Sequence, residues 1–153
     1  MNFQTNKKDG FTIIEVVLVL AIAGLIFLMV FLALPALQRN QRDSQRTQDA
    51  AQAISQLQSY ANSKRGNVPS SYEGFASFWS SYMEDVKSPS GEEYEVLDDL
   101  GVTPETDQVS YSGVNRKCND DADSTDVFTA ASSSRQAAIA MGLEGGVHCL
   151  NLQ

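Results

Sequence analysis

VVLVLAIAGLIFLMVFLAL, residues 16–34, contains neither a charged nor a polar side chain. As a helix that rises about 1.5 Å per residue, a run of this length spans the roughly 30 Å hydrocarbon core of a bilayer. A cleavable secretory signal also follows basic residues such as Lys7 and Lys8, but its apolar run is shorter and ends at a small-x-small cleavage site. Residues 32–35 read LALP and offer no such site. We therefore expect the segment to stay in the mature protein as a membrane-spanning helix.

The length and composition limit what the rest of the chain can be. The 153 residues allow one globular domain plus an appendage, which excludes a large multidomain enzyme. The net charge is −8, and the chain from residue 67 onward contains four basic and fifteen acidic residues. A generally basic surface that binds nucleic acid is therefore not expected. Phosphate-binding glycine loops, nucleophile elbows and metalloprotease motifs are absent from the sequence. We therefore predict a protein that is not an enzyme and holds no cofactor.

Glu15 is a lone carboxylate directly before this apolar run. An acidic side chain is costly inside a bilayer, and the cost falls toward the end of the span. One explanation is a helix-start acid at the membrane interface, where the helix macrodipole favours a negative charge. The surrounding residues support a second explanation, because residues 7–15 read KKDGFTIIE.

This stretch resembles the processing site of type IV pilins and the related type II secretion pseudopilins. The resemblance implies that a membrane peptidase cuts after Gly10, that Phe11 becomes an N-methylated N-terminus, and that Glu15 is the family's hallmark acid. The basic leader, the Gly-Phe-Thr step, the glutamate and the apolar run occur together here. The likeness covers about the first forty residues. It divides the chain into a leader (1–10), a transmembrane and filament-core helix (11–37), a continuation of that helix (38–65) and a globular pilin-like domain (66–153).

Two positions predict weak points in the long helix. Pro35 lacks the amide hydrogen that would bond the carbonyl of Phe31, and Gly24 adds a second site of flexibility. The resemblance implies that the stretch between such residues loses helicity in an assembled filament, although the proline lies a few residues further along than is usual in the family. Ordinary tolerance of Gly and Pro in membrane helices is the alternative.

The next stretch, residues 38–49, reads QRNQRDSQRTQD and has no apolar face. We expect it to be a solvated helix or to face polar neighbours in an assembly. Nucleic-acid contact through its three arginines is disfavoured, because the run lacks interleaved aromatics and contains two aspartates.

The rest of the sequence predicts a small α+β domain. A helical repeat of apolar residues continues the long helix to about residue 65; it comprises Ala50, Ala53, Ile54, Leu57, Tyr60 and Ala61. Ser70 and Glu73 have the spacing of a capping box and predict a second helix. That helix carries an aromatic stripe that favours core packing over ligand stacking: Phe75, Phe78, Trp79, Tyr82 and Met83.

Alternation predicts short strands at 94–96 and 109–111, and residues 136–141 and 146–152 predict a terminal hairpin. The fold class is therefore a long N-terminal membrane-spanning α-helix whose C-terminal half packs on a small antiparallel β-sheet.

Cys118 and Cys149 are the only cysteines, too few for a disulfide scaffold or a four-cysteine zinc site. In an exported domain we expect them to form a disulfide, and two free buried thiols are the alternative. The resemblance supports the bond, because pilins commonly clasp their C-terminal region in this way.

Residues 119–126 read NDDADSTD and offer oxygen ligands at short intervals. The EF-hand pattern fails, since Asp126 stands where glycine is needed, so we favour a solvated acidic loop. A calcium site formed by Asp121, Asp123 and Asp126 is the alternative, because some pseudopilins bind calcium in a loop near the C-terminus.

The resemblance implies a function in assembly. We expect a type IV pilus subunit that crosses the cytoplasmic membrane once, N-terminus inside, and then enters a cell-surface filament that serves adhesion, motility or uptake. Basic residues flank the span on both sides, so the orientation rests on the motif, the acidic distal domain and the cysteine pair. The expected partners are copies of the same chain, the prepilin peptidase and the membrane assembly platform. The alternatives are a type II secretion pseudopilin, a competence pilin for DNA uptake and, from another class, a monomeric membrane-anchored binding domain.

Overall fold

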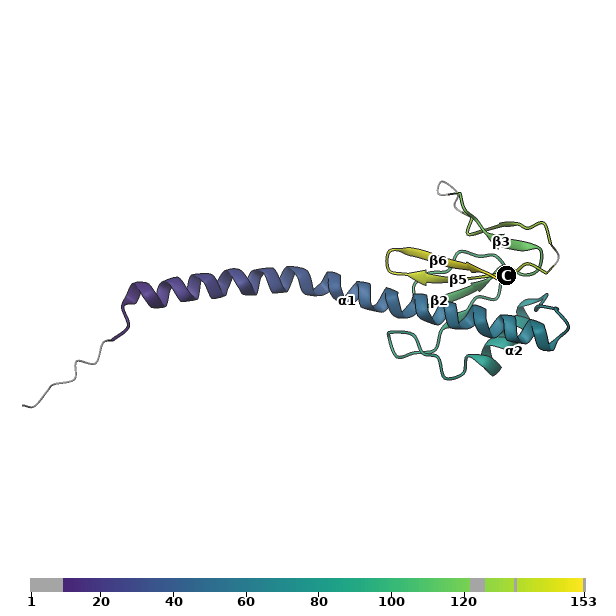
Figure 1. The fold of residues 1–153 in the computed structure, drawn as a ribbon, viewed down its shortest axis with the longest axis horizontal. Helices are drawn as coiled ribbons and strands as arrows, with labels where there is room; N and C mark the ends of the chain where they lie inside the picture. Colours follow the sequence, from purple (N-terminus) through teal and green to yellow (C-terminus); the bar gives the residue numbers. More distant parts are fainter. Residues whose placement is uncertain (1–9, 122–125, 134, 153) are drawn as a thin grey trace, which may run out of the picture. The chain divides into compact units, whose positions relative to one another are not determined.

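The computed structural model of the chain describes residues 10–121, 126–133 and 135–152 (Figure 1). These residues form two compact units that divide after Gln38. The α+β class predicted from the sequence is confirmed. In chain order the elements are α1 (Ile13–Ser63), α2 (Tyr72–Tyr82), β1 (Glu95–Val96), β2 (Gln108–Tyr111), β3 (Arg116–Cys118), β4 (Phe128–Ala130), β5 (Ala138–Leu143) and β6 (Gly146–Asn151).

The first unit consists mainly of the N-terminal part of α1. Its most apolar 18-residue window has a mean hydropathy of 3.2 and no buried residue, so by length and composition it can cross a membrane. Gly24 and Pro35 both lie inside α1, which continues through each of them without interruption. The expected loss of helicity between them belongs to an assembled filament, and it stays a prediction.

The second unit is built on the C-terminal part of α1. Small or slender side chains at helical spacing are buried along one face of it: Ala50, Ala53, Leu57 and Ala61. This face shares one hydrophobic core with α2 and with the inward side chains of β2 and β5. Alanines allow α1 to approach these elements closely, while the larger aromatic side chains of α2 fill the space beside it. The predicted packing of this half of the helix on the sheet is confirmed.

Helix α2 begins one residue later than its sequence pattern predicts. Ser71, in an extended conformation, is the N-cap, and its hydroxyl accepts a hydrogen bond of 3.2 Å from the amide of Gly74. The predicted pairing of Ser70 with Glu73 is therefore wrong. The sequence offers two adjacent serines that suit a cap equally well, and the backbone conformation selects the second. The aromatic stripe of α2 does enter the core, except that Tyr82 is 41% exposed.

The four-stranded sheet has the order β1-β2-β5-β6. Strands β5 and β6 form the predicted terminal hairpin, pairing antiparallel from Ala138 with Asn151 to Leu143 with Gly146. The predicted antiparallel pairing holds for β2 with β5 and for β5 with β6, but the short edge strand β1 pairs parallel with β2, so the sheet is mixed. Residues 97–107 carry the chain back to the start of β2, which a parallel pair requires. Strands β3 and β4, which no sequence pattern predicted, form a separate antiparallel ribbon.

A close backbone crossing occurs at Gly142 in β5. The chain at Thr106 forms a bridge with Gly142, and a Cβ atom at Gly142 would overlap the carbonyl oxygen of Glu105. Only glycine therefore lets the 105–106 segment lie against the sheet.

Gly142→Ala should lower the free energy of unfolding by about 1–3 kcal/mol, because the crossing backbone must move to admit a methyl group. Urea denaturation of the full chain in detergent, followed by the fluorescence of the single tryptophan Trp79 in the core, measures this loss. Gly145→Ala is the matched control, since no atom lies within 4 Å of a Cβ at that position. Equal stabilities of the two variants would contradict the close crossing.

A disulfide joins Cys118 in β3 to Cys149 in β6, as expected, with their Cα atoms 5.8 Å apart. The bond attaches the β3–β4 ribbon to the four-stranded sheet. The side-chain carbonyl of Asn151 adds a second link, accepting a 2.7 Å hydrogen bond from the amide of Cys118. Both contacts therefore fix the ribbon to the same strand, β6.

The double variant Cys118→Ser, Cys149→Ser should lose about 3.5–4 kcal/mol of stability, because the unfolded chain regains the freedom of a loop of about thirty residues. The same urea titration gives the value, and wild-type protein under reducing conditions should behave like the double variant. An unchanged midpoint in both samples would show that the bond contributes nothing to the fold.

Candidate functional site

Helix α1 begins with hydrogen bonds between Thr12 and Glu15. The carboxylate of Glu15 accepts two hydrogen bonds from Thr12, one from the backbone amide at 2.8 Å and one from the hydroxyl at 2.7 Å. This arrangement satisfies a backbone donor that the first turn of a helix leaves free. Sequence reasoning missed the hydrogen bonds, although a threonine followed three residues later by a glutamate, before an apolar run, is a known signature of a helix start.

Glu15 is also the one charged side chain of a shallow apolar groove on this unit, which Phe11, Val16, Val19 and Leu20 also line. The structure therefore brings together Phe11 and Glu15, the two residues predicted to act in assembly. Gly10 directly precedes them and is exposed, as is Phe11. The geometry leaves the bond between Gly10 and Phe11 accessible at the end of the helix.

The apolar side chains of the first unit lack a partner among the described residues. From residue 13 to residue 37 the large hydrophobic side chains are 47–85% exposed. A soluble monomer rarely exposes a continuous apolar surface of this size, so a membrane or neighbouring protein must cover it.

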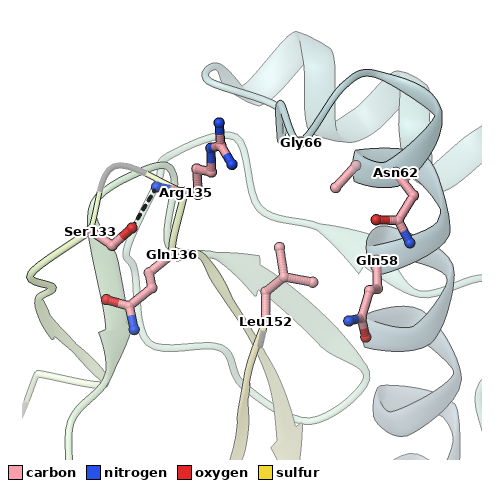
Figure 2. A pocket seen from close by; sticks show the side chains of 8 residues that line it. Gln58, Asn62, Gly66, Ser133, Arg135, Gln136 and Leu152 are labelled. Carbon is pink, nitrogen blue, oxygen red and sulfur yellow. Dashed lines mark hydrogen bonds between the residues drawn. The ribbon is translucent and has the colours of Figure 1, made fainter.

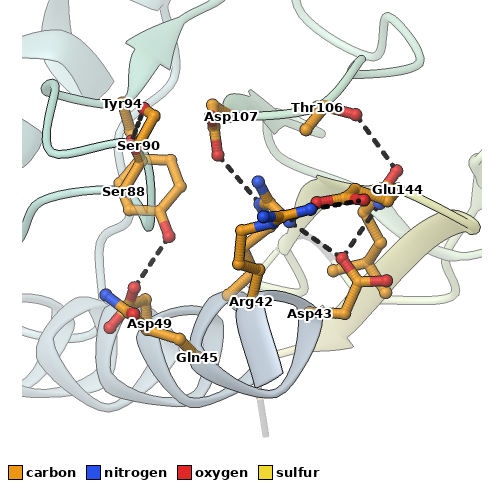
Figure 3. Close-up of polar contacts among 12 residues, drawn as sticks. Arg42, Asp43, Gln45, Asp49, Ser88, Ser90, Tyr94, Thr106, Asp107 and Glu144 are labelled. Carbon is orange, nitrogen blue, oxygen red and sulfur yellow. Dashed lines mark hydrogen bonds and ion pairs between the residues drawn. The ribbon is translucent and has the colours of Figure 1, made fainter. Parts of the chain in front are cut away.

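In the second unit, the polar residues 39–49 of α1 form a charged cluster with the sheet (Figure 3). The side chain of Arg46 is 2% exposed, and its guanidinium donates to Asp107 at 2.8 Å and to Asp43 at 2.9 Å. Glu144, in the β5–β6 turn, binds Arg42 through both carboxylate oxygens, and its backbone amide donates to Asp43 at 2.9 Å. One face of this part of the helix therefore binds its own domain, while side chains on the other face, such as Gln41, Ser44 and Gln48, are exposed.

The charges in this cluster stabilise one another. The pKa of Glu144 lies below its ordinary value, chiefly because Arg42 donates hydrogen bonds to the carboxylate. Burial works to lower the pKa of Arg46, but its hydrogen bonds to Asp107 and Asp43 outweigh that effect and raise the pKa. Arg39 also lies 3.7 Å from Glu144. Each of the three arginines of this stretch therefore lies within 4 Å of a carboxylate of the same chain, and the absence of nucleic-acid binding stays a prediction.

The acidic loop is described only in part. The side chain of Asn119 accepts from the amide of Asp121 at 3.1 Å and donates to the carbonyl oxygen of Asp126 at 3.0 Å. Asp123, the third predicted ligand, lies outside the described residues. Among the residues that the structure describes, no group of three or more acidic, histidine or cysteine side chains is arranged to hold a metal ion. Calcium binding remains a prediction from the sequence.

Comparison with known proteins supports the sequence motif. A family model described as the prokaryotic N-terminal methylation motif matches residues 5–31. This is the class III signal peptide motif of type IV pilin-like proteins, so the resemblance seen around Gly10, Phe11 and Glu15 is confirmed. No curated protein and no solved structure matches the chain.

Proposed function

We propose that the protein is a structural subunit of a type IV pilus filament. In this proposal the leader is removed after Gly10, Phe11 is N-methylated, and the apolar part of α1 holds the chain in the cytoplasmic membrane until it enters the filament. The proposal rests on one observation, the overlap of the methylation motif with the exposed apolar helix. The methylation motif covers residues 5–31, and the same residues include most of an apolar helix that the described chain leaves uncovered.

A filament would cover the exposed apolar side chains of this helix. Lateral packing of many copies buries the apolar side chains against one another after they leave the lipid. In this proposal each copy contacts the next through two different surfaces, and the rotation between neighbours does not close a ring, so the contact propagates as a helical polymer. The proposed work of the protein is this non-covalent assembly, and we propose no catalytic reaction for it.

The same features serve a type II secretion pseudopilin or a competence pilin, which share the motif. The presence of filaments on the cell surface would favour the pilus, and their absence would favour the pseudopilin or the competence pilin. Adhesion, motility and uptake are the roles that a surface filament would serve. A monomeric membrane-anchored binding domain predicts neither cleavage at Gly10 nor a polymer.

Gly10→Leu should block removal of the leader, because the peptidase requires a small residue before the bond that it cuts. The full-length precursor should accumulate in the membrane fraction and surface filaments should disappear. Mass spectrometry of the membrane-bound chain measures this directly. Gly24→Leu, the same substitution deeper in the apolar helix, should be processed normally. A Gly10→Leu chain trimmed to the wild-type mass would contradict the assigned site.

A further inference from the structure

A cleft in the second unit has no part in the proposed assembly. It lies between the last turns of α1 and the residues that precede β5, with Leu152 between the two walls (Figure 2). Asn62 and Gln58 project from the helix side, and Ser133, Arg135 and Gln136 form the opposite side. Its volume of about 350 Å³ falls within the range of small-molecule sites in proteins.

The lining of the cleft combines polar groups with a small apolar surface. Its side-chain amides and the hydroxyl of Ser133 can each both donate and accept hydrogen bonds. The Oε1 atom of Gln136 is buried without a hydrogen-bond partner in the described part of the chain. A buried acceptor left unpaired is unfavourable, so a bound donor or a rotation of this amide toward a ligand would be favoured. Ala61 and Leu152 supply the apolar contact.

Arg135 makes the cleft positive. No carboxylate is among the lining residues, and Arg135 forms no ion pair with any residue that the structure describes. Its guanidinium lies against the backbone of Gly66, whose φ is +84°; a Cβ there would be 3.6 Å from the guanidinium carbon. The guanidinium is therefore at ordinary contact distance from this position, and it is the positive φ that favours glycine there. Lys64 and Arg65 directly precede Gly66 in the sequence, whereas the domain as a whole is strongly acidic.

We propose that this cleft binds an acidic sugar, meaning a hydroxyl-rich ring that carries one carboxylate. The planar guanidinium of Arg135 pairs with the carboxylate through two hydrogen bonds. The amides of Asn62 and Gln136 bind ring hydroxyls, and Leu152 contacts the apolar face of the ring. A single arginine within the cleft matches a single negative charge, and the acidic surface of the rest of the domain repels polyanions.

This inference is independent of filament formation, because every residue of the cleft belongs to the second unit of one chain. It is therefore tested on the full-length, unassembled protein, in a detergent without a sugar headgroup. Ligand-observed NMR titration with glucuronate, compared with glucose, measures both affinity and the contribution of the carboxylate. We expect glucuronate to bind with a Kd of about 1 mM and glucose to bind about tenfold more weakly.

Two variants test the assigned contacts. Arg135→Gln removes the cation from an exposed side chain and should weaken glucuronate binding about tenfold or more. Asn62→Asp places a negative charge on the opposite wall and should weaken it similarly, while glucose binding changes little. Lys87→Gln, which makes the same charge change outside the cleft, is the control and should bind like wild type. Wild-type affinity in Arg135→Gln, equal binding of glucose and glucuronate, or equal weakening in Lys87→Gln would each overturn the proposal.

Discussion

Glu15→Leu should leave membrane insertion, leader cleavage and the folded distal domain intact while reducing filament yield by more than about tenfold. Cleavage after Gly10 creates a positive α-amino group on Phe11, at the end of a helix where the macrodipole opposes a positive charge. Inside a filament core of apolar helices, that amine needs a counter-charge. Family resemblance implies that the amine of an incoming subunit meets the Glu15 carboxylate of a neighbour already assembled. The variant cannot provide this contact, and quantitative blotting of sheared filaments against membrane-bound chain measures the loss.

The hydrogen bonds between Glu15 and Thr12 suggest a competing explanation, in which the glutamate merely caps its own helix. Two further variants separate the explanations. Glu15→Gln keeps an acceptor for the cap but removes the charge, so it should assemble as poorly as Glu15→Leu. Thr12→Ala removes the hydroxyl from the cap but keeps the charge, so it should assemble nearly normally. Glu15→Asp should be milder but still impaired, because the shorter side chain reaches less far. Normal filaments from Glu15→Gln would show that the charge has no role in assembly.

Arg46→Met should destabilise the second unit by about 3 kcal/mol, because it leaves the carboxylates of Asp107 and Asp43 without their buried partner. The value lies at the lower end of the range for a broken buried pair, since the Asp43 and Asp107 side chains are about one quarter exposed and regain some water. Arg46→Lys should recover only part of the loss, because one ammonium group replaces two separate donors. Urea titration followed by Trp79 fluorescence measures each value.

Arg42→Met is the matched control for Arg46→Met, as Arg42 is far more exposed. It should cost only a small fraction of the Arg46 effect. If Arg42→Met lowered the free energy of unfolding as much as Arg46→Met, the burial of Arg46 would not be the reason that the cluster stabilises the fold.

The pH dependence of stability follows from Glu144. Its pKa is lower in the folded chain than in the unfolded chain, so the unfolded chain binds a proton more readily as the solution is acidified. The stabilisation is complete above the ordinary carboxyl pKa and is lost as the pH falls through the lowered one. Arg42→Met removes the main cause of the lowered pKa, so its stability should fall less steeply over the same acidic range. Parallel curves for the two proteins would contradict this assignment.

The features that the sequence predicted well depend on local patterns. The methylation motif around Gly10, Phe11 and Glu15 is a short local pattern, and the family model that matches residues 5–31 confirms the motif. The burial of Ala50 and Leu57 follows from helical periodicity. The terminal hairpin follows from two apolar runs separated by a glycine-rich turn.

The features that were missed depend on contacts between distant residues. Arg46 lies in a run without an apolar face, and its partner Asp107 is 61 residues away, so the hydrophobic pattern does not predict its burial. The spacing of Arg42, Arg46 and Asp49 along one helix face was the available signal. Tyr94 donates a 2.7 Å hydrogen bond to Asp49, which shows that this face contacts the domain. Alternation predicts a strand at the position of β1, but it does not give the direction in which β1 pairs with β2. Strands β3 and β4 have only three residues each, too few for alternation to reveal.

Intact-mass spectrometry of sheared surface filaments tests the central claim most directly. We expect a filament subunit that begins at Phe11, carries one methyl group on its α-amino nitrogen and contains the Cys118–Cys149 disulfide. Fragmentation of the N-terminal peptide locates the methyl group on Phe11. A filament subunit that retains residues 1–10, or surface filaments that lack this chain while it remains uncleaved in the membrane, would contradict the account.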